Sequence, residues 1–188
     1  MQEAVAMPAL WLPIVLSAVI VFVGSSIVWM VLKYENADWK PVPGEDQLRE
    51  AVRKLNLAAP GQYVFPHMMG SSDPQAAMKK WEEGPNGLLL LIKPQKFSMG
   101  GRLTLAFIYY LVVSFFAAYV ASHALARGTD YLRVFQIVGA ASFMGYGLGV
   151  FTDAIWWGRT WSSAFKTALS ALIYACLTAG TFGWLWPR

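Results

Sequence analysis

The chain has unusually few charged residues. Only 14% of its 188 residues are Asp, Glu, Lys or Arg and 56% are hydrophobic, whereas a typical soluble domain carries about 25% charged residues. This deficit argues against a soluble globular domain and indicates that lipid is the main solvent. The net charge of +4 does not indicate nucleic-acid binding, because the positive residues are spread around the edges of the predicted membrane segments. We expect the lipid bilayer as a partner and no nucleic acid.

Cysteine and histidine are also scarce. The single cysteine, Cys176, falls in an apolar segment, where an unpaired thiol behaves as a small hydrophobic group. His67 and His123 fall on opposite sides of the predicted membrane, so a haem held between two histidines is not expected. His67-Met68-Met69 contains soft copper ligands, but no repeated methionine spacing or cysteine pair supports a metal site. We therefore predict neither a metal nor a cofactor.

Catalytic signatures are missing as well. The sequence has no HExxH motif, no phosphate-binding loop and no pair of carboxylates on one helix face. The glycines at 145, 147 and 149 are only superficially similar to a dinucleotide fingerprint, because they lie inside a predicted membrane helix and do not join a strand to a helix. We predict that the protein is not an enzyme.

Long apolar segments are what the chain has instead. Four of them reach the roughly 20 residues that cross a bilayer. They are residues 9–32, 103–126, 134–152 and 161–186. A signal peptide is the competing interpretation of the first segment, but its apolar run is about twice the usual length and no Lys or Arg precedes it. We expect a permanent anchor and, in total, four transmembrane helices.

The distribution of Lys and Arg predicts an orientation. Ten of these residues lie between positions 33 and 102, and Arg159 and Lys166 raise the number on that side to twelve. The opposite side has Arg127, Arg133 and Arg188. Because Lys and Arg favour the cytoplasmic side, we expect the polar segment in the cytoplasm and both termini outside.

A polar, turn-rich segment separates the first two spans. Residues 45–57 have apolar positions at helical spacing, with acids first and bases last, which predicts a helix. Ser72-Asp73-Pro74 predicts the start of a second helix that ends at Gly84-Pro85. Residues 62–65 are a candidate strand. Residues 87–94 are too short to span a bilayer and form a buried strand or an interfacial segment, and we favour a strand that pairs with residues 62–65.

Small residues recur every four positions in the last three spans. The rows include Ala118 in the second span, Gly145 and Gly149 in the third, and Ala171, Ala175 and Ala179 in the fourth. Each row forms one helix face on which backbones can touch, and in lipid such contact is the main source of helix association. We expect the rows to hold the chain's own helices together; one of them could also join copies of the chain.

The predicted fold class is an all-α bundle of four transmembrane helices with a small α+β extramembrane insertion between the first two. The predicted domains are residues 1–34, which form the first span, residues 35–101, which form the insertion, and residues 102–188, which form the other three spans.

One group of polar residues lies at the end of the third span. Asp153 is followed by Trp156, Trp157 and Arg159, and Lys166 lies near the start of the fourth span. An ionisable group at membrane depth is costly and usually pairs with an opposite charge or lines a cavity. We expect Asp153 and Lys166 to form a salt bridge across the short loop. The alternative is a binding site for an anion or a lipid headgroup, with Arg159 and the two tryptophans around a phosphate.

Several stretches also resemble a known family. They are residues 11–30, Gly84-Pro85, Ser98-Met99-Gly100, residues 116–121 and residues 178–187. Together they resemble a family of small four-helix proteins of the bacterial inner membrane that has no assigned function. The resemblance covers most of the chain and implies a bacterial inner-membrane location. It implies no activity and no functional residue.

The sequence favours a non-catalytic integral membrane protein that acts through assembly. It would be a subunit or accessory factor of a larger membrane complex, or a homo-oligomer. The alternative is a channel, or a membrane protein that binds a small molecule, a lipid or a cofactor, using the end of the bundle that carries Asp153, Arg159 and Lys166.

Overall fold

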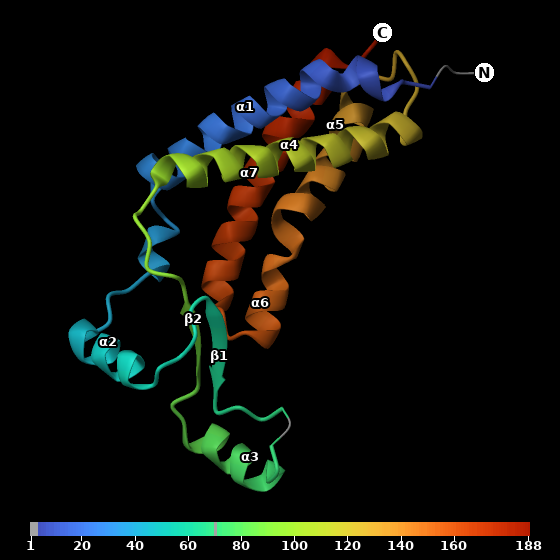
Figure 1. The fold of residues 1–188 in the computed structure, drawn as a ribbon. Coiled ribbons are helices and arrows are strands. Elements are labelled where there is room, and N and C mark those ends of the chain that lie inside the picture. Colours follow the sequence, from blue (N-terminus) through green and yellow to red (C-terminus); the bar gives the residue numbers. More distant parts are fainter. Residues whose placement is uncertain (1–3, 70) are drawn as a thin grey trace. The chain divides into compact units, whose positions relative to one another are not determined.

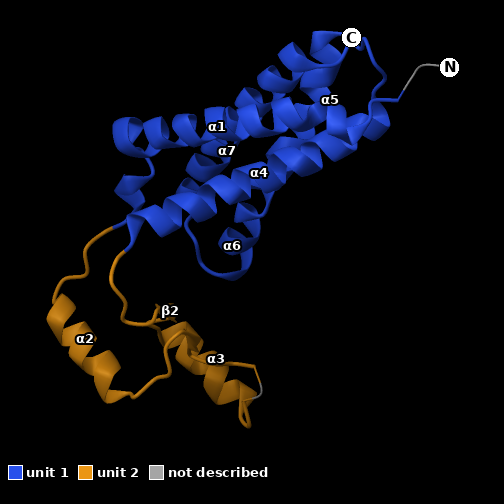
Figure 2. Ribbon diagram, turned by 45° about the horizontal axis from the view of Figure 1, so that its top comes forward, with its two compact units in different colours: residues 1–39, 98–188 blue, residues 40–97 orange. Residues whose placement is uncertain are grey.

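The structure is a computed structural model that describes residues 4–69 and 71–188 (Figure 1). Residues 1–3, which belong to the domain predicted over residues 1–34, and Gly70 lie outside the described residues. The chain separates into two compact units (Figure 2). One unit, the membrane unit, combines Met1–Trp39 with Ser98–Arg188, and the other, the insertion, is Lys40–Phe97.

Four helical segments of the described chain are long and apolar enough to cross a membrane. They are Met7–Leu32, Met99–Ala124, Tyr131–Trp156 and Trp161–Leu185. Each contains 25 or 26 residues, which is more than the roughly 20 residues that a bilayer requires. The protein is therefore a multi-pass membrane protein, as the sequence predicts.

Two of the spans contain a π-helical turn. The first consists of η1 (Met7–Leu10), α1 (Trp11–Ile27) and the π turn η2 (Val28–Leu32). The third consists of α5 (Tyr131–Phe143), the π turn η4 (Met144–Leu148) and α6 (Val150–Trp156). The second and fourth are the single helices α4 (Met99–Ala124) and α7 (Trp161–Leu185). A short 3-10 helix, η3 (Asn36–Asp38), follows the first span.

Side-chain caps define where three of the membrane helices begin. The Ser98 hydroxyl accepts from the backbone N–H of Gly101 at the start of α4. Asp130 and Thr160 accept in the same way from backbone N–H groups three residues later, at the starts of α5 and α7. Such caps satisfy donors that have no partner inside the helix. The sequence thus sets the helix starts through local polar residues.

The membrane helices pack side by side along small-residue faces. Helix α1 contacts α4 and α7, and α5 contacts the same two helices. Ala118 of α4 and the alanines at 171, 175 and 179 of α7 are all buried. Larger side chains such as Val138 and Phe182 fill the space between the helices and are also fully buried. Close backbone approach and apolar filling therefore hold this unit together.

The third span differs from the predicted row of small residues. A Cβ atom added at Gly147 would lie 2.7 Å from the Cβ atom of Ala171, so Gly147 makes the close approach to α7. Gly145 instead faces Val113 of α4, and a Cβ atom at Gly149 would meet nothing within 4 Å. The cause is the π turn η4, because its extra residue rotates the helix faces that a regular spacing of four would predict.

The insertion contains two short helices and a two-stranded sheet. Its elements are α2 (Glu45–Lys54), β1 (Gly61–Phe65), α3 (Pro74–Glu83) and β2 (Gly87–Leu91). The strands are antiparallel, with Gly61 opposite Leu91, so the predicted pairing is confirmed. Asp73 caps α3 by accepting from two backbone N–H groups. Helix α2 ends three residues before its predicted end, because Asn56 adopts a positive φ of 48°.

Candidate functional site

A network of polar side chains joins the start of α7 to the segment that follows the first span. That segment contributes Tyr34, Glu35 and Asp38. The side chains on the other side are Arg159, which precedes α7, and Ser163, Lys166, Thr167 and Ser170 of α7 itself. All of these residues belong to the membrane unit. We call this set the α7 polar network.

The ion pair of Lys166 differs from the one predicted. Its Nζ atom donates to Asp38 Oδ1 at 2.7 Å, and not to Asp153. The two side chains are 30% and 19% exposed, so the pair is partly withdrawn from water. Lys166 lies on the same side of α7 as Thr167 and Ser170, which also contact this segment after the first span. The prediction considered only the loop between the third and fourth spans and therefore missed the closer carboxylate.

Glu35 is held by hydroxyl groups of α7. Its Oε2 atom accepts from Thr167 Oγ1 at 3.1 Å, and its Oε1 atom accepts from Ser170 Oγ. The Tyr34 hydroxyl is also hydrogen-bonded to Ser170 Oγ. A carboxylate that leaves bulk water needs such donors to offset its lost hydration. The hydroxyl groups therefore stabilise Glu35 at the end of the first span.

Arg159 completes the network from the other side. Its Nε atom donates to Ser163 Oγ at 3.1 Å and its Nη2 atom donates to Thr167 Oγ1 at 2.7 Å. Its Nη1 atom lies 3.9 Å from Asp153 Oδ2, and its backbone N–H donates to the Asp153 carbonyl oxygen. Because Thr167 also donates to Glu35, the hydroxyl links the guanidinium to the carboxylate. Asp153 is thus paired with Arg159, at a distance near the limit for an ion pair.

The two predicted tryptophans do not enclose a site with Arg159. Trp156 at the end of α6 is 76% exposed, and Trp157 in the following loop is 54% exposed. The described ring contacts of this end join Phe151, Trp161 and Phe165 instead. Exposed tryptophans near the ends of membrane helices are typical of the interface between water and lipid. Their position fits a membrane anchor better than an anion pocket.

A group of tyrosines continues the polar line deeper into the membrane unit. Tyr174 lies one turn beyond Ser170, and its ring packs edge-on against the rings of Tyr110 and Tyr146, with centroids 6.1 and 6.0 Å away. The Tyr146 hydroxyl lies 3.4 Å from Thr178 Oγ1. Tyr109 donates to the carbonyl oxygen of Gly145, which lies in the π turn η4. A π turn leaves backbone groups without their usual partners, and this hydroxyl satisfies one of them.

Comparison with protein-family models, curated proteins and solved structures finds no match to this chain.

Glu35 and Asp38 are the two acidic network residues, and the sequence-based interpretation missed both as site residues. It assigned both to the insertion, whereas the structure keeps them with the membrane unit, which extends to Trp39. The available signal was the spacing of Ser163, Thr167 and Ser170, at intervals of four and three residues. This spacing places all three hydroxyls on one face of a helix and predicts a polar partner for that face.

The arrangement acts as a clamp between the first and fourth spans. Arg159 and Lys166 both have partners within the chain, so an anion would have to displace Asp38 or the α7 hydroxyls before it could bind. Within residues 4–69 and 71–188, no group of three His, Cys, Asp or Glu side chains is placed to hold a metal ion. The geometry therefore supports a structural role for the α7 polar network.

Proposed function

We propose that this protein is a non-catalytic membrane protein that acts through assembly. It is built as a four-helix bundle and associates with copies of itself or with other membrane subunits. Two features support the proposal. The α7 polar network has its partners inside the chain, and the third span keeps a small-residue surface exposed to the surroundings.

The exposed surface of the third span is the observation that carries the proposal. Gly149 is exposed, and no atom lies within 4 Å of the position that a Cβ atom there would take. Thr152 is exposed next to it, and its hydroxyl donates to the Gly149 carbonyl oxygen at 2.6 Å. In lipid, exposed small residues let a second helix approach closely. We call Gly149 and Thr152 the small-residue surface.

The mass of the particle in mild detergent tests this proposal. We expect a mass above that of one 20.8 kDa chain, from copies or from a retained partner. Gly149→Leu should lower the mass to that of one chain without disturbing the fold, because the added side chain meets open space. Ala140→Leu is a matched control, since Ala140 is an exposed small residue of the same span outside the small-residue surface. A wild-type protein that is strictly monomeric and retains no partner would refute the proposal.

The binding of a small molecule, lipid or cofactor at Asp153, Arg159 and Lys166 is less well supported. Each of these residues is already paired within the chain. A ligand would have to compensate for the lost ion pair as well as its own desolvation.

The proposed location is the bacterial inner membrane. The resemblance to small four-helix proteins of that membrane supports this location. The excess of Lys and Arg on one side supports a cytoplasmic insertion and termini on the outer side.

A further inference from the structure

Five cations of the insertion, Lys40, Arg53, Lys80, Lys93 and Lys96, have no acid partner among the described residues, and three of them lie on or close in sequence to the lining of one hollow. The first of these three is Arg53 on α2, and the other two are Lys93 and Lys96, which follow β2. Among the described residues none of the three has an ion-pair or hydrogen-bond partner. No Asp or Glu occurs in the sequence from Gly84 to Thr129. The segment that connects β2 to the membrane therefore carries positive charges and no negative charge.

Other cations of the insertion behave differently. Arg49 lies 3.8 Å from Asp46, Lys54 lies 2.9 Å from Glu50, and Lys79 lies 3.8 Å from Glu83. These pairs lie within α2 or α3 at the spacing that brings helix side chains together. The insertion thus has a neutralised set of cations, Arg49, Lys54 and Lys79, and an unpaired set near β2 and the end of α2, Arg53, Lys93 and Lys96. Lys40 and Lys80 also have no ion pair, but they belong to other segments of the insertion.

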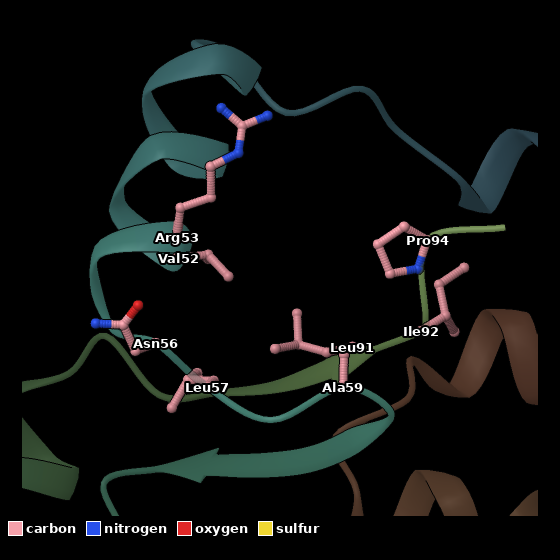
Figure 3. A pocket seen from close by; sticks show the side chains of 8 residues that line it. All are labelled: Val52, Arg53, Asn56, Leu57, Ala59, Leu91, Ile92 and Pro94. Carbon is pink, nitrogen blue, oxygen red and sulfur yellow. The ribbon is translucent and has the colours of Figure 1, made fainter.

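One member of the unpaired set, Arg53, lines an apolar hollow. The hollow has a volume of about 420 Å³, and Figure 3 shows Arg53 on its α2 side and Leu91 pointing into it from β2. The residues that line it are Val52, Arg53, Asn56, Leu57, Ala59, Leu91, Ile92 and Pro94. Lys93 lies between two of these residues in the sequence. An apolar surface close to positive charges suits a partner that has both an apolar group and a negatively charged group.

One face of the sheet is also uncovered. Leu88 and Leu90 alternate with the inward-facing residues of β2 and are 41% and 67% exposed, and Ile92, just after the strand, is 70% exposed. Gln62 lies opposite Leu90 in the antiparallel register and shares its face. A two-stranded sheet is marginally stable in water alone. Large aliphatic side chains on such a sheet need a covering surface.

We propose that this part of the insertion docks on the anionic phospholipid surface of the bilayer that the chain spans. Leu90 and Ile92 enter the interface, and Arg53, Lys93 and Lys96 contact lipid phosphates. Charge complementarity supports lipid as the occupant, because the segment is cationic and has no acid. The short connection between β2 and α4 also supports lipid as the occupant. The seven residues from Ile92 up to the start of α4 at Met99 reach at most about 25 Å, so the sheet stays near the membrane. Basic segments next to a membrane span bind anionic leaflets in this way.

This inference goes beyond the proposed function and does not depend on it. Assembly uses the exposed surface of the third span, whereas docking uses the insertion. A monomeric protein could still dock, and an oligomer could form with the insertion free of lipid. The mass measurement therefore tests only the proposed assembly, and the lipid experiment tests only the docking of the insertion.

The test uses the whole chain with one fluorescent probe. Cys176→Ala removes the natural thiol, and Gln62→Cys, labelled with bimane, places the probe beside Leu90 without removing an apolar side chain. The protein is reconstituted in nanodiscs of phosphatidylcholine, alone or mixed with phosphatidylglycerol. Nitroxide-labelled lipids report contact between the probe and the membrane. A second labelled protein, Gln75→Cys on exposed α3, is the reference for a water-facing position.

We expect the probe at position 62 to be quenched and shifted to shorter wavelength only in phosphatidylglycerol discs. Each cation near an anionic surface contributes a factor of about five, so the variant Arg53→Gln with Lys93→Gln and Lys96→Gln should weaken docking by roughly 100-fold. The matched variant Arg49→Gln with Lys54→Gln and Lys79→Gln loses the same charge and should dock almost as well as the unaltered protein. High salt should release the probe.

Three outcomes would overturn the proposal. The probe could remain water-exposed in both lipids, or the two triple variants could lose quenching equally, which would indicate a non-specific charge effect. The probe could also be shielded in native membranes and exposed in purified lipid, which would identify a protein as the occupant.

Discussion

Lys166 on the fourth span donates to Asp38 at the end of the first span across 2.7 Å, although 128 residues separate them in the sequence. Thr167 and Ser170, on the same side of α7, donate to Glu35. Together these contacts hold the segment after η2 against α7. The insertion begins at Lys40, only two residues beyond Asp38, so the clamp fixes the point at which the chain leaves the membrane unit.

Removal of the Asp38 charge should destabilise the membrane unit. Asp38→Asn removes the negative charge from a partly buried ion pair with Lys166, and we expect a loss of roughly 1–3 kcal/mol in the free energy of unfolding. Denaturation in detergent, followed by intrinsic tryptophan fluorescence, measures it. Asp153→Asn is the control, because its carboxylate is 51% exposed and 3.9 Å from Arg159, and it should cost less than about 1 kcal/mol. Equal effects of the two substitutions would contradict the clamp.

Ser170 should be important for stability although it is a small hydroxyl residue. Ser170→Ala removes the hydroxyl that donates to Glu35 and is hydrogen-bonded to Tyr34. The Oε1 atom of the half-buried carboxylate would then lose its donor, while Thr167 still donates to Oε2, and we expect a cost of about 1–3 kcal/mol in unfolding free energy. Ser162→Ala, at an exposed position of the same helix, should change stability by no more than about 0.5 kcal/mol. The same unfolding measurement compares them, and a neutral Ser170→Ala would show that Glu35 does not need this donor.

The two neighbouring glycines of the third span should respond oppositely to alanine. Gly147→Ala places a methyl group 2.7 Å from the Cβ atom of Ala171, so η4 and α7 must separate. We expect it to cost about 1–3 kcal/mol. Gly149→Ala meets open space and should be neutral or stabilising by up to about 1 kcal/mol, because alanine favours a helix. Melting temperatures in one detergent decide the matter; a Gly149→Ala protein that melts lower than Gly147→Ala would argue against the placement of η4.

The proposed orientation can be tested with single cysteines in a Cys176→Ala background. Gln75→Cys lies in the exposed part of the insertion, and Arg188→Cys lies at the exposed C-terminus. In spheroplasts of a bacterial host, a membrane-impermeant maleimide should label position 188 and not position 75. In inverted membrane vesicles it should label position 75 only. The opposite pattern would mean that the insertion is on the outer side.

The local elements could be predicted because their signals are local. Asp73-Pro74 specifies the start of α3 through a side-chain cap and a fixed φ, and the runs before and after α3 are short and apolar enough to pair as strands. The four spans follow from length and hydropathy alone. The polar contacts of α7 could not be predicted in the same way, because hydropathy does not state which distant carboxylate a lysine will meet.

The third span illustrates the same division. Its glycines are evident in the sequence, and a regular helix would place Gly145 and Gly149 on one packed face. The π turn η4 changes that phase, so Gly147 meets Ala171 and Gly149 remains exposed. No local sequence pattern reports this rotation, because a π turn is stabilised by contacts from other helices, such as the hydrogen bond that Tyr109 donates to Gly145.

By itself, the sequence determined a multi-pass membrane protein with four apolar spans and a small mixed insertion, because burial in lipid and backbone hydrogen bonding constrain composition along each segment. The tertiary structure decided which residues meet. It paired Lys166 with Asp38, joined Arg159 to Glu35 through Thr167, and selected Gly147 for the close contact between η4 and α7. These choices depend on helix phase and on the relative rotation of packed helices, and both arise only when distant segments come together.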